Sequence, residues 1–136
     1  MNPLHMLRLF TMVFAITLAV GCSKSDKVDV KANMAALKSA EGEAKVNALV
    51  ELSKAGPEAA PAVPDLITLL KDTDPMVRRL AAYTLGQIGE KAKPASAELK
   101  RLMTDSDRDV VMNAVNALRA IDAASVQGVK VDNVTN

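Results

Sequence analysis

Residues 64–89 read PDLITLLKDTDPMVRRLAAYTLGQIG, and this stretch decides the fold. Its first part has apolar residues at the spacing of an amphipathic helix, namely Leu66, Ile67, Leu69 and Leu70. Asp74 and Pro75 then mark the start of a second helix, because Asp is a good N-cap and Pro is favoured at the first helical position. One face of this second helix is apolar and consists of Val77, Ala81, Leu85 and Ile88. Gly89 can adopt a positive φ and end the helix.

The same pattern recurs 33 residues further along the chain. The first set of matching positions is Leu66, Leu69, Asp72, Asp74, Val77, Ala81, Leu85 and Ile88. In the same order, the second set is Leu99, Leu102, Asp105, Asp107, Val110, Ala114, Leu118 and Ile121. A weaker copy lies upstream, at Leu37, Ala48, Leu52 and Gly56. Three copies predict six helices, at roughly 29–40, 43–55, 61–71, 75–88, 94–103 and 108–121. Because one helix pair cannot bury its apolar face alone, we expect the copies to stack.

The motif of residues 64–89 resembles a HEAT repeat, of the bacterial type also seen in phycobilin-lyase-like proteins. The resemblance covers most of residues 30–122 and implies an all-α fold. The expected architecture is a short, right-handed α-solenoid of about three HEAT-like helix pairs, used as a protein-binding scaffold. Residues 123–136 have no helical period, so we expect a flexible C-terminal tail.

The resemblance also implies a ladder of ion pairs between adjacent repeats. Asp72 and Arg78 match the paired positions of the family. The third copy has Val111 in place of the Arg, and the first copy has Ser39 and Lys45 at the two places. We therefore expect an incomplete ladder that contributes little stability.

The N-terminal segment has the features of an export signal. Leu9 to Gly21 are 13 mostly apolar residues without charge, preceded by Arg8. A spanning helix needs about 20 such residues, whereas this length fits the apolar region of a secretory signal. The sequence LAVGC at residues 18–22 resembles the lipobox of bacterial lipoproteins, with Ala19 at a position that is usually Leu.

This second resemblance implies that the chain is cut before Cys22 and acylated on its thiol. Residues 1–21 would then be a lipoprotein signal peptide and residues 22–29 the lipidated Cys and a polar linker. Two or three acyl chains would hold the protein on a membrane, since each buried CH₂ contributes about 0.8 kcal/mol. By family analogy, Ser23 favours the outer membrane, facing the periplasm, in a Gram-negative source. The alternative is a free Cys at the end of an uncleaved anchor.

Composition excludes several classes of function. The chain after residue 21 has no His, because the only one is His5, and it has 16 basic and 16 acidic residues. Without His there is no Ser-His-Asp triad and no His-ligated metal site. A nucleic-acid binder usually shows a basic excess, which is missing here. We therefore expect no enzyme, no cofactor and no nucleic-acid partner.

Two groups of carboxylates could serve as a calcium site or as an acid–base pair. Residues 105–109 read DSDRD and resemble the opening of a calcium loop, but Val110 and Asn116 stand where that loop needs Gly and an acid. Asp65, Asp72 and Asp74 could form an acid–base pair. We instead expect these carboxylates to cap helices or to lie near their positive ends.

A mixed strip on the second helix of each copy is the candidate binding surface. It lies off the apolar face, and its predicted partner-binding residues are Arg79, Tyr83, Met112 and Asn116. Such residue types are enriched at protein interfaces. The alternatives are an ordinary solvated face, or a Tyr83 that is covered by residues 123–136.

These observations predict a membrane-anchored lipoprotein that binds a protein partner without catalysis. Two alternatives remain. The protein could assist an enzyme, as a chromophore-attachment lyase-like HEAT protein would, or it could be a purely structural protein of the cell envelope.

Overall fold

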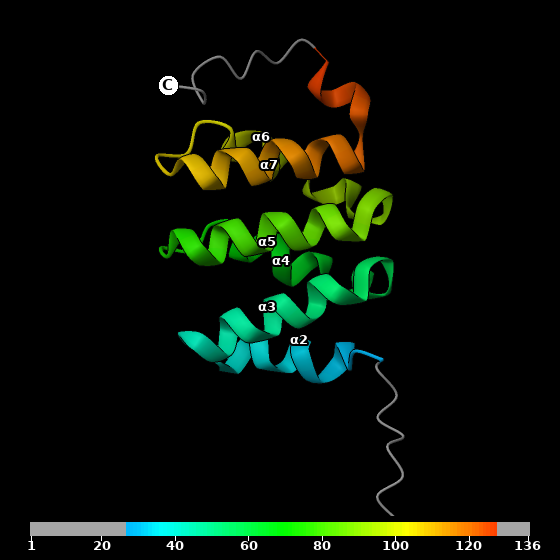
Figure 1. The fold of residues 1–136 in the computed structure, drawn as a ribbon, viewed down its shortest axis with the longest axis vertical. Coiled ribbons are helices and arrows are strands. Elements are labelled where there is room, and N and C mark those ends of the chain that lie inside the picture. Colours follow the sequence, from blue (N-terminus) through cyan, green and yellow to red (C-terminus); the bar gives the residue numbers. More distant parts are fainter. Residues whose placement is uncertain (1–26, 128–136) are drawn as a thin grey trace, which may run out of the picture.

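The computed structural model describes residues 27–127, and this part of the chain consists of α-helices and short 3₁₀ helices without a strand. Figure 1 shows the helices stacked one above another along the long axis of the molecule. The elements are α2 (Val30–Ser39), α3 (Glu43–Ala55), η1 (Gly56–Ala62), α4 (Val63–Leu69), α5 (Pro75–Ile88), η2 (Gly89–Ala95), α6 (Ser96–Leu102), α7 (Arg108–Ile121) and η3 (Ala123–Val126).

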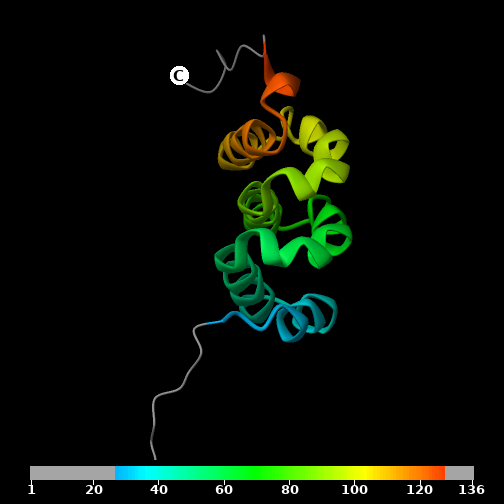
Figure 2. The same ribbon diagram turned by 90° about the vertical axis from the view of Figure 1, so that its right-hand side faces the viewer.

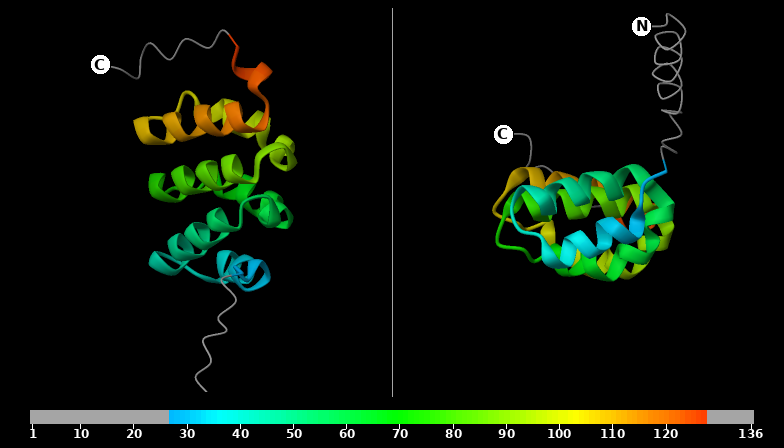
Figure 3. Two further views of the ribbon diagram at one scale, coloured as in Figure 1. Left: turned by 45° about the vertical axis from the view of Figure 1, so that its right-hand side comes forward. Right: turned by 90° about the horizontal axis from the view of Figure 1, so that it is seen from below.

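The helices form three pairs in two layers. Figure 2 shows α3, α5 and α7 stacked in one layer and α2, α4 and α6 in the other. Figure 3 shows the same stack obliquely, with α3, α5 and α7 one above another, and from below, along the axis of the stack. The all-α architecture of three stacked helix pairs is therefore confirmed.

The second helix of each pair begins and ends as its sequence predicts. The carboxylate of Asp74 accepts a hydrogen bond from the N–H of Met76 at 2.9 Å, so Asp74 caps α5. At the other end Gly89 has φ 71° and ψ −141°, and the equivalent Gly56 has φ 54° and ψ −130°. Only glycine adopts this region without strain. These two glycines therefore end α5 and α3 and turn the chain towards the next pair.

The first helices of the second and third pairs begin later than expected. We predicted starts near residues 61 and 94, whereas α4 starts at Val63 and α6 at Ser96. The intervening residues form the 3₁₀ helices η1 and η2, which contain Pro61 and Pro94. Proline lacks the N–H that a continuous α-helix would use, which favours a separate short turn at these places.

The core is a continuous seam between the two layers. The apolar face predicted for α5 is buried, with Leu85 fully inaccessible, and its counterpart Leu118 in α7 is equally buried. Leu66 in α4 and Leu70 at its C-cap are core positions, while Ile67 and Leu69 are only half-buried. A core of Ala, Leu, Ile and Val therefore carries the fold, with Met34 and Met103 partly buried against it.

Neighbouring second helices approach one another through small or short side chains. Thr84 is fully buried, and its hydroxyl lies 2.8 Å from the carbonyl oxygen of Leu80 and 3.2 Å from that of Leu49 in α3. On the other side of α5, a Cβ added to Gly86 would lie 3.1 Å from the Cα of Ala117 in α7. The absence of a side chain at Gly86 thus allows α5 and α7 to pack closely.

The beginning of the predicted tail differs from expectation. Asp122 accepts a hydrogen bond from the N–H of Ala124 at 3.2 Å and caps η3. Val126 is partly buried and packs against the core. Residues 123–126 are therefore ordered against α7 because a local cap and one apolar contact hold them. Residues 128–136 lie outside the described part of the chain, as do the predicted signal and Cys22.

Candidate functional site

The four predicted partner-binding residues lie on the adjacent helices α5 and α7. Tyr83 is 44% exposed and Met112 is 45% exposed, and Asn116 is exposed as well. Arg79 is partly exposed and lies one turn before Tyr83. We use the name binding strip for this surface of Arg79, Tyr83, Met112 and Asn116.

Met76 extends the binding strip, and the sequence analysis missed it. Its side chain is 41% exposed, and its sulfur lies 2.8 Å from an Nη atom of Arg79. Among the described residues, Met76, Tyr83 and Met112 are the large apolar side chains that remain exposed, and all three belong to α5 or α7. The spacing of Met76 and Arg79, three residues apart in one helix, could have revealed their contact.

A groove lies between the C-terminal halves of α5 and α7. We call it the amide-rimmed groove, and its volume is about 170 Å³. It is lined by Tyr83, Gly86, Gln87, Asn113, Asn116, Ala117 and Ala120. Small residues in this lining, Gly86 and Ala117, lie where α5 and α7 approach most closely. The structure thus brings Tyr83 and Asn116 together at one concavity.

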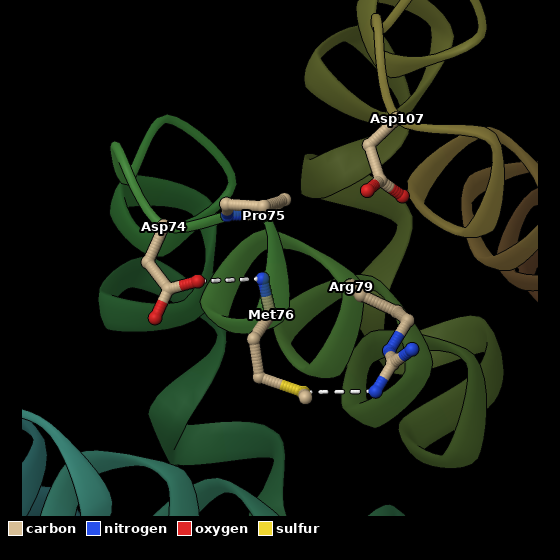
Figure 4. A pocket seen from close by; sticks show the side chains of 5 residues that line it. All are labelled: Asp74, Pro75, Met76, Arg79 and Asp107. Atoms are coloured by element: carbon tan, nitrogen blue, oxygen red, sulfur yellow. Dashed lines mark hydrogen bonds between the residues drawn. The ribbon is translucent and has the colours of Figure 1, made fainter.

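A second concavity lies at the other end of the same two helices. We call it the acidic hollow; its volume is about 160 Å³, and it is lined by Asp74, Pro75, Met76, Arg79 and Asp107. Figure 4 shows Asp107, at the start of α7, facing α5 from above Arg79. The guanidinium of Arg79 donates to the carboxylate of Asp109 at 3.2 Å. Arg79 is therefore a paired cation, whereas Tyr83 and Met112 are exposed apolar members of the strip.

The first helix pair contributes less to this surface. Val46 and Val50 of α3, which correspond to Arg79 and Tyr83, are half-buried, and Lys54 forms an ion pair with Glu51 at 2.6 Å. The open part of the strip therefore belongs to α5 and α7.

The ion-pair ladder is more complete than we expected. The Nζ of Lys45 in the first pair lies 3.3 Å from the Oδ2 of Asp72 in the second. The Nη2 of Arg78 in the second pair lies 2.9 Å from the Oδ1 of Asp105 in the third. Each junction between described helix pairs thus has the ion pair that the ladder requires. The prediction of an incomplete ladder was wrong for both described junctions, because Lys45 takes the place of the Arg in the first copy. Val111 occupies the cation position of the third copy, and no further helix pair follows this copy within the described residues.

Local hydrogen bonds lower the pKa values of both ladder carboxylates. For Asp72 the largest cause is the hydrogen bond from the N–H of Asp74, and Lys45 adds to the effect. For Asp105, burial alone would raise the pKa. Hydrogen bonds from Arg78 and from the N–H of Asp107 outweigh that burial, and the pKa is lowered. Both carboxylates are therefore held in the charged form.

The carboxylates of residues 105–109 each have a structural partner. Asp105 pairs with Arg78, Asp107 accepts the N–H of Val110 and caps α7, and Asp109 pairs with Arg79. Across residues 27–127, no three His, Cys, Asp or Glu side chains are grouped as a metal site would require. Asp65 likewise pairs with Lys38 at 3.5 Å, and Asp74 caps α5.

No helix within the described range is both long and apolar enough to cross a membrane. The lipobox residues and Cys22 lie outside that range.

Comparison with known proteins agrees with this architecture. The family model described as HEAT repeats matches residues 30–119, which include every α-helix from α2 to most of α7. Searches of curated proteins and of solved structures each gave no match.

Proposed function

The chain belongs to the family of HEAT repeats, and from this premise we propose that it is a non-catalytic scaffold that binds a protein partner through the binding strip. Proteins of stacked helical repeats offer extended surfaces that suit this purpose. The proposal assigns the contact to the exposed side of α5 and α7.

One observation carries the proposal. Met76, Tyr83 and Met112, the exposed large apolar side chains of the described residues, lie on the same two adjacent helices. Scattered single apolar residues are normal on a protein surface, whereas a group on one face indicates an interaction site. Tyr also offers a large contact area with little rotamer entropy to lose on binding.

We propose further that lipid on Cys22 anchors this scaffold to a membrane of the cell envelope. The support is the apolar run of residues 9–21, which ends in Gly21-Cys22 and is followed by polar residues. An anchor of this kind would present the repeats to partners near the membrane surface. In a Gram-negative source we expect the outer membrane.

The anchor can be tested separately from the binding. Cys22→Ala should leave an unprocessed protein, which migrates more slowly and no longer labels with a radioactive fatty acid. Cys22→Ala that is processed and membrane-held like the parent would refute the anchor and leave the binding proposal intact.

Cross-linking in intact cells tests the binding. Tyr83→Ala combined with Arg79→Ala should abolish the cross-linked partner while the melting temperature stays within about two degrees, because both side chains are at least partly exposed. Lys100→Ala, at an exposed position of α6 in the other layer, is the matched control and should retain the partner. A stable double variant that still forms the cross-link would refute the binding strip. The absence of any partner in the parent would favour a purely structural envelope protein.

A further inference from the structure

We propose that residues 128–136 close the end of the repeat stack as an extended segment across Val111 and Val115 of α7. This surface is separate from the binding strip, so the inference does not depend on the proposed function. The segment would have the part of a terminal cap, which gives the last unit of a repeat protein a polar outer face.

One side of α5 faces the third helix pair. Arg78 pairs with Asp105 of that pair, and a Cβ on Gly86 would lie 3.1 Å from the Cα of Ala117 in α7. Ala82 lies four residues from both Arg78 and Gly86, which places it on the same side of the helix. Ala82 is fully buried. The third pair therefore covers this side of α5.

The corresponding side of α7 faces the end of the stack, because α7 is the last second helix of the described chain (Figure 1). The positions that follow the α5 residues by one repeat are Val111, Val115 and Arg119. Arg119 is exposed, as a residue at an open end should be. In contrast, Val111 is 9% exposed and Val115 only 3%. The two valines are therefore covered, although no further helix pair follows them within the described residues.

The described neighbours of α7 explain this burial only in part. The helix packs against α5, α6, η2 and η3, but neither valine belongs to the continuous core of the described residues. η3 adjoins the C-terminal end of α7, whereas Val115 lies six residues before that end, a distance of about 9 Å along the helix. Both valines are buried within a single chain, which favours a segment of the same chain over a second copy.

The sequence that follows η3 suits this surface. Residues 128–136 read GVKVDNVTN. Val129 and Val131 alternate with charged residues, which is the period of an extended segment with one apolar side. Their charged neighbours, Lys130 and Asp132, would face water and give the end of the stack its polar surface.

The spacing of the two pairs of valines also agrees. Two residues of an extended segment span about 6.6 Å, and the helical turn from Val111 to Val115 spans about 6 Å. Val126 packs against the core and fixes where the segment begins. A segment that runs back along α7 from there covers about 10 Å in three residues, which is close to the distance from the end of α7 to Val115. Val129 would then lie on Val115, and Val131 on Val111.

Thiol labelling tests this cover. The reporter is Val115→Cys in the full-length protein in mild detergent, with Cys22→Ala added so that the chain has one thiol. Val129→Ser combined with Val131→Ser removes the apolar side of the segment. Lys130→Ser combined with Asp132→Ser changes the alternate positions and is the matched control. The rate of reaction with a maleimide dye is measured in each background.

The valine double variant should raise the labelling rate of the Val115→Cys thiol by about tenfold or more, because a buried group reacts only when its cover opens. The charged double variant should leave the rate within about twofold of the parent rate. Ala82→Cys, at the equivalent position of α5, should stay protected in every background because α7 covers it. Met112→Cys, at an exposed position, should label rapidly throughout.

Four results would overturn the inference. Equal protection of Val115→Cys in the parent and in the valine double variant would show that the segment does not cover it. Equal acceleration by the two double variants would show that the alternating valines are not the cause. Protection that is lost on dilution, in a protein that is dimeric by light scattering, would assign the surface to a second copy.

The fourth result concerns general unfolding. Val129→Ser alone disturbs the segment less than the double variant does, and it should still accelerate labelling of Val115→Cys but not of Ala82→Cys. Equal acceleration of the two thiols in this milder variant would show that the whole domain opens, and it would refute a local cover.

Discussion

The guanidinium of Arg78 and the carboxylate of Asp105 form a two-point ion pair across the junction between the second and third helix pairs. The Nε–Oδ2 and Nη2–Oδ1 distances are both 2.9 Å, and both side chains are largely buried. The remaining Nη1 donates to the carbonyl oxygen of Asp72 at 2.8 Å. Arg78 therefore connects the α4–α5 turn of its own pair to the α6–α7 turn of the next.

Removal of one partner should destabilise this junction strongly. We expect Arg78→Met to lower the free energy of unfolding by about 3 kcal/mol, because it leaves Asp105 charged and largely buried. Asp105→Asn should also destabilise, and the double variant should lose less than the sum of the two single losses. Urea unfolding of the four proteins measures this coupling. Arg101→Met is the control, since Arg101 is 72% exposed and its pair with Glu98 should contribute less than about 1 kcal/mol. Strictly additive losses would show that the pair has no net coupling.

Acid should weaken the same junctions. The pKa values of Asp72 and Asp105 are lowered in the folded protein, so the unfolded chain takes up protons at a higher pH than the native one does. The stabilising contribution is therefore complete well above the ordinary value of 3.8, and it is lost as the pH falls through the lowered folded values. We expect the urea midpoint to drop between pH 5 and pH 3. Asp105→Asn, which has one fewer of these carboxylates, should show a smaller drop, and an equal drop would contradict this assignment.

Much of the fold follows from local sequence patterns. The period of apolar residues, the Asp74-Pro75 start and Gly89 predicted α5 closely, because each of these signals acts within a few residues of its own position. The starts of α4 and α6 were misplaced because Pro61 and Pro94 fit either an α-helix start or a 3₁₀ turn. For the binding strip, the 33-residue repeat placed Tyr83 and Asn116 at equivalent positions of α5 and α7, and both residues line the groove.

Features that depend on contact between repeats were harder to predict. The role of Lys45 was underestimated because the first copy has Lys where the family has Arg, and its pairing with Asp72 depends on how the two repeats pack. The groove was missed for a similar reason. Its base depends on the distance between α5 and α7 at Gly86, and a single sequence does not encode that distance locally.

Truncation of Leu85 tests the central seam. Leu85 is fully inaccessible in α5, with a helix pair on either side. Leu85→Ala should lower the free energy of unfolding by about 2–5 kcal/mol, because it removes buried methyl groups and leaves a cavity. Gln87→Ala, two residues along the same helix and exposed, is the control and should change stability by less than about 0.5 kcal/mol. A loss of that small size for Leu85→Ala would mean that the apolar face of α5 is assigned wrongly.

Substitution of Gly86 separates helix propensity from packing. In an isolated helix, Gly→Ala stabilises by about 1 kcal/mol. At Gly86 the new Cβ would lie 3.1 Å from the Cα of Ala117 and 3.4 Å from its Cβ. Because the nearest atom belongs to the backbone, this contact can be relieved only if α7 moves away from α5. Overpacking of this kind costs about 1–3 kcal/mol, so we expect Gly86→Ala to be neutral or destabilising by up to about 2 kcal/mol.

A larger side chain should make the packing term dominate. Gly86→Leu should destabilise more than Gly86→Ala, since its extra carbons would have to occupy the groove or force the helices apart. In a domain of this size, 1 kcal/mol corresponds to a change of roughly 4–8 °C in melting temperature, which thermal unfolding followed by circular dichroism resolves well. A Gly86→Ala protein that melts well above the parent would contradict this expectation. It would show that α5 and α7 can move apart at little cost in free energy, so that the close contact at Gly86 is not required for their packing.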